Sequence, residues 1–432
     1  MKISIIGGGS AYTPGLVEGL LAIRSEVPFT ELCLMDIDAA KLKTVSHIVA
    51  KIMAAEMPDV KVSSTTHRIE AIKDSAFILC QIRVGGLAGR VLDEKIPLKY
   101  NTIGQETVGP GGFAMALRTL PEMHSIARDI KKHAPDAWLI NYSNPSGMVA
   151  AMLARYTDIN AISICDVPSG IQHFIASFLK LPQDKVKIDY VGLNHLGWFR
   201  RFIVDGKDIM PQIREMAKTT DVVGQLPTDD EKTVAETRNM VRIFNKLGII
   251  PSPYLQYYYL GQECLQDQLE TGLTRGEVVQ QIEKDLLGHF EEVAQGKDAK
   301  LWKSRGGEWH SQLMVGVLSA IHNDKGQEIA VNVINNGAVP GMPAEACVEI
   351  PCIVDRRGAR PLQVDPPDKD MLGLMQLVSA YEDLTVEAAM ENSYDKALRA
   401  LNLNPLVQSL EVAEKILDEY IQAHGDYIKL SK

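Results

Sequence analysis

The feature that most constrains this fold stands at the start of the chain, where a short apolar run leads directly into a glycine turn. Residues 2–6 read Lys-Ile-Ser-Ile-Ile, and Gly7, Gly8, Gly9 and Ser10 follow them. In a dinucleotide-binding fold the first strand ends in such a turn, because glycines let the backbone approach a pyrophosphate at the N-terminus of the next helix. The turn therefore predicts a nucleotide site, although its spacing departs from G-x-G-x-x-G.

An acidic residue at the end of a second apolar run supports the same interpretation. Asp36 follows residues 32–35, about where the dinucleotide fingerprint places an acid for the ribose hydroxyls. The alternative is a strand-to-helix turn of glycines that binds no ligand. The residues that we expect to contact the cofactor are Gly7, Gly9, Ser10, Ala11, Tyr12, Asp36 and Arg83.

Composition excludes several classes of partner. The chain has 432 residues, of which 46% are hydrophobic, and it is long enough for two domains of ordinary size. Its formal net charge of −10 is spread without long acidic or basic runs, so we expect neither nucleic acid nor a membrane surface as a partner. No segment approaches the roughly 20 apolar residues of a membrane span, and the first strand is too short for the core of a signal peptide. We therefore expect a cytoplasmic protein.

Short apolar runs and helical patterns alternate through about the first 200 residues. We expect strands at 2–6, 31–35, 76–82, 137–141 and 161–165, and helices near 14–24, 38–55, 112–133 and 145–156. This alternation predicts an α/β fold with a mostly parallel, doubly wound sheet and right-handed crossovers. Ligands of such sheets bind beyond the carboxyl ends of the strands, so the residues just after each strand are the candidate site.

The pattern is less regular from about residue 200 onward. Strand-like runs at 200–204, 328–334 and 346–354 lie between amphipathic helices near 228–247, 274–295, 370–391 and 408–424. We therefore divide the chain into a nucleotide-binding domain, residues 1–200, and a second domain, residues 201–432. The apolar faces of the long helices in the second domain predict a homodimer or homotetramer.

Two residues that could bind a metal lie in separate polar segments. Cys165 ends an expected strand, and His195 lies in the segment G-L-N-H-L-G-W. A thiolate and an imidazole could hold a divalent cation and leave positions open for substrate and water. The alternative is that both side chains only pack in the core, and none of the six cysteines forms a C-x-x-C pair.

Other polar side chains gather in loops. Glu106 lies in the glycine-rich segment 103–112, where an acid has no packing purpose and a solvated loop acid is the alternative. Arg83 and Arg90 flank a pair of glycines, and guanidinium groups suit a phosphate, a carboxylate or a surface salt bridge. Tyr254 begins a cluster of four tyrosines, which indicates a core, an interface or, less often, a proton-transfer site.

Segments along almost the whole chain together resemble one family, the NAD- and metal-dependent glycosidases of glycoside hydrolase family 4. Ten segments carry the resemblance, in the order of that family: I-G-G-G-S-A-Y-T-P, I-R-V-G-G, D-E-K-I-P-L-K-Y, I-G-Q-E-T-V-G-P-G-G, N-Y-S-N-P-S-G, C-D-V-P, G-L-N-H-L-G-W, P-Y-L-Q-Y-Y, R-G-G-E-W and V-E-I-P-C. The resemblance implies an N-terminal Rossmann-like sheet followed by an α+β domain like that of lactate and malate dehydrogenases. It also implies NAD and a divalent cation, usually Mn²⁺, as cofactors.

The resemblance further implies roles for individual residues. The implied catalytic residues are Asp166, Tyr254 and Glu106, the metal ligands are Cys165 and His195, and the substrate-binding residues are Arg90, Asn144, Asn194 and Arg275. Tyr254 matches the catalytic base of the family, and Asp166 matches the general acid proposed in part of it. Arg83 is a candidate for the substrate's phosphate as well as for the cofactor.

The implied chemistry is hydrolysis through a reversible oxidation, an exception to the two-carboxylate scheme of glycosidases. In this scheme NAD⁺ takes a hydride from carbon 3 of the sugar, and the resulting ketone acidifies the proton on carbon 2 while the metal stabilises the enolate. Tyr254 removes that proton, the aglycone leaves with help from Asp166, water adds, and NADH returns the hydride.

The resemblance favours 6-phosphorylated α-glucosides, such as maltose 6'-phosphate, as substrates. I-R-V-G, G-P-G-G, C-D-V-P and G-L-N-H-L-G-W resemble the 6-phospho-α-glucosidases, and Asp166 can protonate a glycosidic oxygen where β-acting relatives commonly have asparagine. I-G-G-G-S-A-Y-T-P, D-I-D, R-G-G-E-W and A-L-N-L-N-P-L-V resemble the 6-phospho-β-glucosidases, so that activity stays an alternative. An NAD-dependent 2-hydroxy-acid dehydrogenase and a non-enzymatic NAD sensor are alternatives from other classes.

Overall fold

The structure of the protein is a computed structural model that describes residues 1–224, 226, 230–295 and 308–431. In the last of these ranges, side chains are described from Ser311 onward. A parallel sheet forms the first half of the protein. The strands are β1 (Lys2–Ile6), β2 (Glu31–Met35), β3 (Lys61–Thr65), β4 (Ser75–Cys80), β5 (Trp138–Asn141) and β6 (Asn160–Ser163). They lie in the order β3-β2-β1-β4-β5-β6, so the strand order reverses between β1 and β4. This is the doubly wound arrangement, and the predicted fold class is confirmed.

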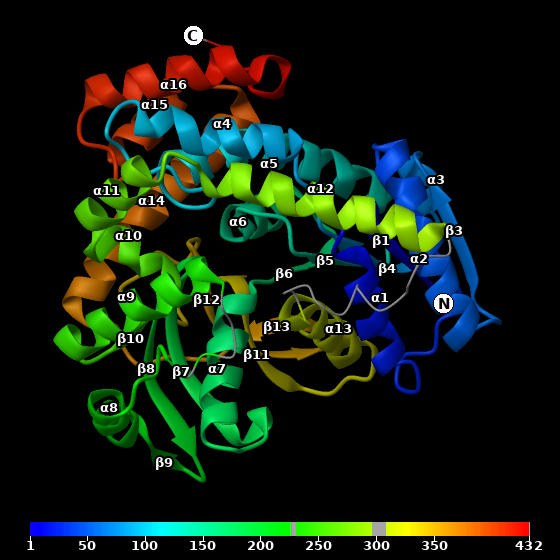
Figure 1. Ribbon diagram of the computed structural model, residues 1–432, viewed down its shortest axis with the longest axis horizontal. Coiled ribbons are helices and arrows are strands. Elements are labelled where there is room, and N and C mark those ends of the chain that lie inside the picture. The colour runs from blue at the N-terminus through cyan, green and yellow to red at the C-terminus, as the bar shows by residue number, and fades with distance from the viewer. Residues whose placement is uncertain (225, 227–229, 296–307, 432) are drawn as a thin grey trace.

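Helices pack on both faces of this sheet (Figure 1). They are α1 (Thr13–Ala22), α2 (Ala39–Glu56), α3 (Arg68–Ile72), α4 (Gly86–Leu98), α5 (Gly109–His133), α6 (Ser146–Tyr156) and α7 (Asp166–Phe178). The first turn of α2 begins after Asp38, whose side chain accepts hydrogen bonds from the backbone N–H groups of Ala40 and Lys41. Because the six strands are parallel, the connection that follows each strand lies at the same edge of the sheet. The polar segments of the sequence gather at this edge.

An antiparallel part extends the same sheet beyond β6. Its strands are β7 (Val186–Leu193), β8 (Leu196–Val204), β9 (Lys207–Asp208), β10 (Ile250–Pro251), β11 (Gln327–Ile334), β12 (Cys347–Asp355) and β13 (Gly358–Pro361). The order continues as β6-β11-β12-β7-β8-β10. Asn332 of β11 pairs with Ser163 of β6, and Glu349 of β12 pairs with Gly192 of β7. Asn332 and Ser163 therefore join the antiparallel part to the parallel part, and Glu349 lies at a second join within the antiparallel part.

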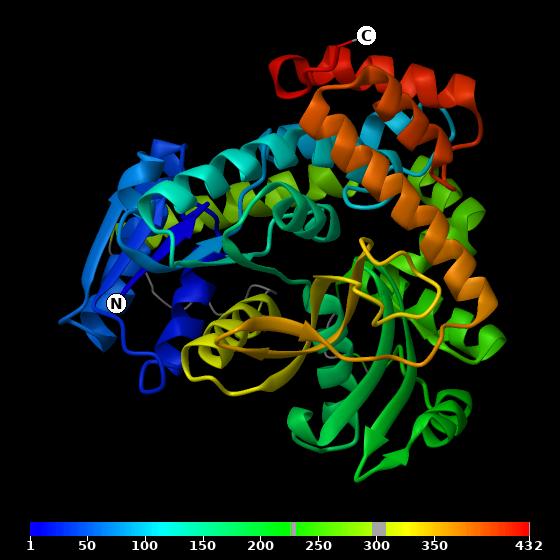
Figure 2. The ribbon, with the colours of Figure 1, turned by 180° about the vertical axis from the view of Figure 1, so that it is seen from behind.

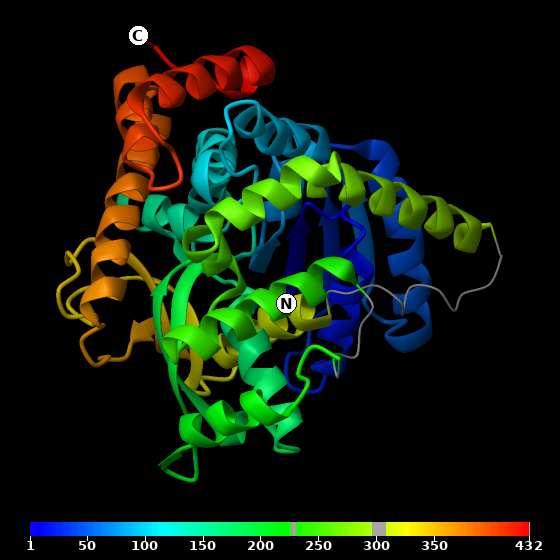
Figure 3. The same ribbon diagram turned by 60° about the vertical axis from the view of Figure 1, so that its left-hand side comes forward.

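The remaining helices surround this sheet. They are α8 (Met210–Thr219), α9 (Glu231–Leu247), α10 (Gln256–Tyr259), α11 (Gly261–Thr271), α12 (Arg275–Ala294), α13 (Glu308–His322), α14 (Lys369–Glu391), α15 (Tyr394–Leu403) and α16 (Leu410–His424), with one-turn 3₁₀ helices η1 (Gln183–Lys185), η2 (Pro253–Leu255) and η4 (Gly425–Tyr427). The long helix α12 runs beside α4 and α2 of the first half (Figure 3). Seen from behind, α14 rises past α5 and α6 and leads to α15 and α16 near the C-terminus (Figure 2). Segments from both ends of the sequence thus pack together.

Two apolar clusters stabilise these layers. The larger cluster runs through the parallel sheet and continues through β11 and β12 to α14–α16. The smaller cluster lies between β7–β8 and the helices α7–α9, and Tyr190, Phe199 and Phe202 fill its centre. In the described part of the chain, no helix is both long and apolar enough to cross a membrane.

The expected elements agree with the structure mostly to within a few residues. The strand expected at 200–204 begins at Leu196, because it is the second arm of a hairpin with β7. The helix expected near 112 begins at Gly109, and helix α4 occupies a segment that we expected only as a polar loop. Helix α9 begins after Asp230, which caps it, while the expected residues 228–229 lie outside the described part. The segment R-G-G-E-W, residues 305–309, has no described side chains. The division of the chain into two domains at residue 200, which falls within β8, stays a prediction.

Candidate active site

The glycine turn joins β1 to α1 at the carboxyl end of the parallel strands. The N–H groups of Gly7 and Gly8 both donate to the carbonyl of Met35 at the end of β2. Gly7 has a φ of +87°, and a Cβ there would lie 2.7 Å from the carbonyl oxygen of Gln81. Only glycine fits this position, so the tight turn that the sequence predicted is built into the fold.

Asp36 faces this turn. Its Oδ2 accepts a hydrogen bond of 2.9 Å from the N–H of Gly9, and its Oδ1 accepts one of 3.0 Å from the N–H of Asp38. The predicted cofactor residues Ser10, Ala11 and Tyr12 come directly after the glycine turn and lead into α1, which begins at Thr13. The structure therefore brings the glycine turn, the acid after β2 and the N-terminus of a helix to one place.

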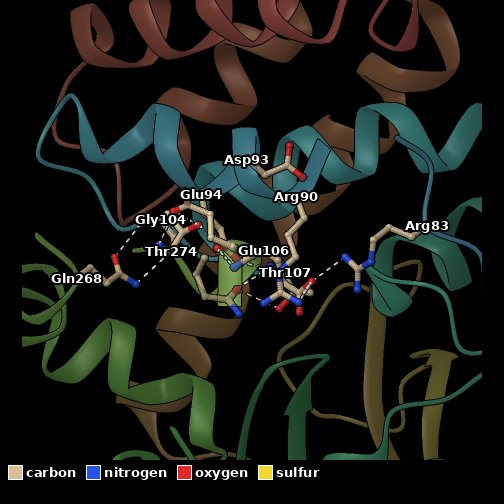
Figure 4. A network of polar contacts seen from close by, with 12 residues as sticks. Arg83, Arg90, Asp93, Glu94, Gly104, Glu106, Thr107, Gln268 and Thr274 are labelled. Atoms are coloured by element: carbon tan, nitrogen blue, oxygen red, sulfur yellow. Dashed lines mark hydrogen bonds and ion pairs between the residues drawn. The ribbon is translucent and has the colours of Figure 1, made fainter. Parts of the chain in front are cut away.

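A largely buried chain of alternating charges joins Arg83, Glu106, Arg90 and Glu94 (Figure 4). Glu106 Oε2 is 2.6 Å from Arg83 Nη1 and 3.0 Å from Arg90 Nη1. Arg90 Nε also donates to Glu94 Oε1 at 2.8 Å, and Glu94 Oε2 accepts a bond of 2.6 Å from the N–H of Gly276 in α12. The chain thus links α4, the glycine-rich loop after it and the N-terminus of α12.

These contacts set the charge of Glu106. Burial opposes ionisation, but the adjacent guanidinium groups of Arg83 and Arg90 outweigh it and lower the pKa of Glu106 to about 2. Glu106 therefore stays a carboxylate at neutral pH and cannot act as a proton donor. Burial raises the pKa of Glu94, although the charge of Arg90 opposes that shift.

Cys165, His195 and Tyr254 come together from three separate segments. Cys165 follows β6 and precedes α7, His195 lies in the β7–β8 turn with a φ of +63°, and Tyr254 lies in η2 after β10. The rings of His195 and Tyr254 stack with their centroids 3.9 Å apart. The side chain of Asn194, the residue that precedes His195, acts on Cys165 and opposes the rise in the pKa of its thiol.

The donor set of Cys165 and His195 fits a divalent metal. Burial lowers the pKa of His195 to about 3, so the imidazole is neutral, and its buried Nδ1 has no hydrogen-bond partner among the described residues. A neutral imidazole nitrogen and a thiolate are both common metal ligands. No group of three or more His, Cys, Asp or Glu suited to a metal occurs in the described ranges.

The buried thiol and phenol keep their protons in this environment. Burial raises the pKa of Cys165 well above its usual value, and the charges of Glu349 and Asp166 add to the shift. Burial likewise raises the pKa of Tyr254, with further contributions from Cys165 and Glu236. Both groups therefore need a nearby positive charge in order to ionise at neutral pH.

Asp166 is the first residue of α7 and lies beside Tyr142, which follows β5. Burial raises the pKa of Asp166, while a hydrogen bond from the Tyr142 hydroxyl opposes the shift. Asn144 lies in the same loop as Tyr142, and its Oδ1 accepts a bond of 3.3 Å from the N–H of Ser146. The predicted acid and the predicted sugar-binding amide thus follow the neighbouring strands β6 and β5.

Arg275 begins α12 at the outer end of the charge chain. Its Nη2 lies 3.8 Å from Asp230 Oδ1, and about a third of its side chain is exposed. The next residue, Gly276, is the one bonded to Glu94, so Arg275 lies close to the same network.

The sequence analysis did not single out four polar residues in or around this site, namely Glu94, Tyr142, Lys232 and Glu349. Glu94 stands four residues after Arg90, and side chains four residues apart on a helix can form an ion pair. This spacing could have indicated the pair if the segment had been predicted as a helix. Lys232 forms an ion pair of 2.9 Å with Glu236 in the first turns of α9, and its charge reaches Glu106 and His195. An acid in the apolar run V-E-I-P-C was the signal for Glu349.

Comparisons with known proteins agree with this arrangement. The profile of the family 4 glycosyl hydrolases matches residues 2–181, and that of the family 4 glycosyl hydrolase C-terminal domain matches residues 190–407. A 6-phospho-beta-glucosidase of Escherichia coli is 34% identical over 99% of this chain and 96% of its own length.

Solved structures share the whole fold. A 6-phospho-alpha-glucosidase from gut microorganisms, in complex with NAD and glucose-6-phosphate, is 34% identical with a TM-score of 0.93, over 100% of this chain and 99% of its own. A 6-phospho-beta glucosidase from Thermotoga maritima, with manganese, NAD⁺ and glucose-6-phosphate, is 31% identical with a TM-score of 0.88 over 100% of both chains. At 14% identity and a TM-score of 0.53, a malate dehydrogenase from Plasmodium falciparum shares the fold alone. This chain belongs to the family 4 glycosyl hydrolases.

Proposed function

We propose that this protein is a 6-phosphoglucosidase that works with a bound NAD and a divalent cation. The observation that carries the proposal is the meeting of Cys165, His195 and Tyr254 at the edge of the sheet where β1 also ends in a dinucleotide-type glycine turn. Solved relatives at 34% and 31% identity hold NAD with glucose-6-phosphate, and one of them also holds manganese, which supports the same ligands here. A simple 2-hydroxy-acid dehydrogenase gives no reason for the paired thiol and imidazole.

The glycine turn and Asp36 are the proposed NAD site. Each carboxylate oxygen of Asp36 accepts one backbone hydrogen bond and keeps a free lone pair, so both oxygens remain available to ribose hydroxyls. The N-terminus of α1 favours the negative charge of the pyrophosphate. Arg83 lies after β4, on the same edge of the sheet, and is the proposed basic contact of this site.

Cys165 and His195 are the proposed metal ligands, and Tyr254 is the proposed base. When bound, NAD would supply a reversible hydride transfer at carbon 3 of the sugar, and the cation would act as a Lewis acid on the sugar oxygens. Tyr254 would then take the proton from carbon 2. Burial holds the proton on its phenol, with the charges of Glu236 and Glu106 adding to the effect, and a cation at Cys165 would offset both.

Asp166 is the proposed general acid for the leaving group. Its burial moves the carboxyl toward the protonated state that a proton donor needs, and the Tyr142 hydroxyl fixes its orientation. Protonation matters most for a sugar leaving group, because an alkoxide is a poor leaving group. This supports hydrolysis of α-linked 6-phosphoglucosides such as maltose 6'-phosphate as the finer proposal. The 34% identity to a 6-phospho-beta-glucosidase favours the β-linked substrate as the second candidate.

The substrate's sugar and phosphate would meet groups that line the same edge of the sheet. Asn144 and Asn194 are the proposed sugar contacts, and Arg90 and Arg275 are the proposed phosphate contacts. Arg90 keeps N–H groups beyond those that it gives to Glu94 and Glu106, because a guanidinium has five donors. Glu106 would hold Arg83 and Arg90 in place as a fixed carboxylate.

Activity on matched substrates tests the proposal. The protein would be incubated with NAD⁺ and Mn²⁺ and given α- and β-linked p-nitrophenyl glucoside 6-phosphates in parallel. Nitrophenol release without net NADH is the expected result, and its loss in EDTA with recovery on added Mn²⁺ is the control. Steady accumulation of NADH would overturn the proposal in favour of a dehydrogenase. The ratio of the two rates decides the anomer.

Two further expectations remain part of the proposal. A phosphorylated sugar is charged and does not cross a membrane unaided, so an enzyme that uses it acts where it is made, in the cytoplasm. The assembly is proposed to be a homodimer or homotetramer, which the molar mass in solution tests.

A further inference from the structure

A buried carboxylate lies within the antiparallel part of the sheet, where β12 pairs with β7. Glu349 of β12 is 1% exposed, and it accepts hydrogen bonds from Tyr190 Oη at 2.7 Å and Asn194 Nδ2 at 3.0 Å. Asn332 Nδ2 lies 3.5 Å from the same carboxylate. All three donors are neutral. Burial raises the pKa of Glu349 to about 7, against the effect of these hydrogen bonds.

The fold makes room for this arrangement at a specific place. A Cβ on Gly197 would lie 2.1 Å from Tyr190 Oη, so the phenol reaches Glu349 only because residue 197 is glycine. Asn332 also donates toward Ser146 Oγ at 3.2 Å and the Ser163 carbonyl at 3.3 Å. Tyr190 of β7 and Asn332 of β11 therefore hold the Glu349 carboxylate in one position from its two sides.

Asn194 connects this carboxylate to the proposed metal ligands. One N–H of its amide donates to Glu349, and its Oδ1 accepts a bond of 3.3 Å from the N–H of Gly147. Both the nitrogen and the oxygen of the amide thus have a partner, and the same side chain also acts on the Cys165 thiol. Its orientation is thereby set, and His195 follows it directly in the chain.

We propose that Glu349 positions the metal-binding pair and balances the charge of the cation, because it holds Asn194 in the turn that carries His195. The proposal rests on the proposed metal site. A buried carboxylate with only neutral partners is unfavourable by itself, and a divalent cation close by would stabilise it. Groups that orient metal ligands commonly change metal affinity by about 10- to 100-fold when they are altered.

Glu349→Gln tests this inference, because glutamine has nearly the same size and its N–H can donate to Tyr190 Oη. The measurement is the Kd of Mn²⁺ for the NAD-loaded protein without sugar, from the electron paramagnetic resonance signal of free Mn²⁺. We expect the Kd to rise at least about 10-fold. We also expect an unchanged Kd for NAD and a metal-free Tm no lower than that of the wild type.

A matched control and a second variant complete the test. Glu382→Gln changes another carboxyl group whose pKa burial raises, to about 8, on α14, and it should leave the Mn²⁺ Kd unchanged. If Glu349→Gln does not fold, Glu349→Asp keeps the charge but withdraws it from Asn194, and it should still weaken Mn²⁺ binding several-fold.

Three results would overturn the inference. They are an unchanged Mn²⁺ Kd in the Glu349 variants, an equal loss in Glu382→Gln, and a loss that comes only with a large fall in metal-free Tm and in NAD binding. If the wild type itself does not bind Mn²⁺, the proposed function fails instead. Wild-type binding with equal binding by Glu349→Gln refutes this inference alone.

Discussion

The ring of Tyr254 stacks on the imidazole of His195, with the centroids 3.9 Å apart and the planes inclined by 25°. The two residues are 59 positions apart in the chain, and the pairing of β10 with β8 brings them together. The contact places a phenol, a neutral imidazole and the Cys165 thiol within one buried cluster. The proposed base and a proposed metal ligand are therefore in direct contact, so they could act on adjacent carbons of one sugar.

Tyr254→Phe removes the hydroxyl but keeps the stacked ring. We expect kcat to fall by about 10²- to 10⁴-fold, the usual contribution of a positioned base. The Kd values for Mn²⁺ and NAD should stay within about twofold of the wild type, because the aromatic contact with His195 is retained. Steady-state kinetics and metal titration measure the two effects. A variant with more than a tenth of the wild-type kcat would show that Tyr254 is not the base.

Asp36→Asn tests the nucleotide site. The amide keeps the size of the side chain but replaces one of the oxygens that accept from Gly9 and Asp38 and that are proposed to bind the ribose hydroxyls, so we expect the Kd of NAD to rise at least about 10-fold. Asp38→Asn is the matched control, since Asp38 caps α2 and, among the described residues, its side chain accepts from the N–H groups of that first turn. It should lower Tm slightly and leave NAD binding intact, as measured by fluorescence titration.

The sequence allowed the strand ends to be predicted, because apolar runs and glycines are local signals. Asp36 and Cys165 were found by their place after such runs. Helix α4 was missed because Gly85, Gly86 and Pro97 all weaken a helical pattern, and tertiary packing overrides that preference. Glu349 received no role because its partner Tyr190 is 159 residues away, and no periodicity reveals a contact of that range.

The stability of the protein should depend on Glu106 in a specific pH range. Its pKa is lowered from 4.5 to about 2, so its contribution is fully present above about pH 5 and is lost as the pH falls toward 2. Glu106→Gln leaves Arg83 and Arg90 without their shared carboxylate and should lower the free energy of unfolding by about 3 kcal/mol at pH 7. The difference from the wild type should narrow below pH 5 in urea denaturation. A difference that is constant from pH 7 to pH 3 would contradict the assigned charge state.

Asp166→Asn should separate substrates by their leaving groups. Nitrophenolate leaves without protonation, whereas a sugar alkoxide needs a proton, so we expect a loss of about 10²- to 10⁴-fold on a disaccharide 6-phosphate. The loss on the p-nitrophenyl glucoside 6-phosphate of the same anomer should be about tenfold or less. Equal losses on both substrates would rule out Asp166 as the general acid and leave it an orienting role beside Cys165.

Cys165→Ser should abolish activity and weaken Mn²⁺ binding, because a serine hydroxyl does not ionise to replace a thiolate ligand at neutral pH. Cys352→Ser is the control. Cys352 is also fully buried, but its thiol points to the carbonyl oxygen of Ile350 in β12, and a serine hydroxyl can make the same hydrogen bond. The control should retain full Mn²⁺ affinity and activity at saturating NAD, whatever small change its Tm undergoes. If Cys165→Ser binds Mn²⁺ as tightly as the wild type in the same titration, the metal does not use this thiol, and His195 must bind it with other partners.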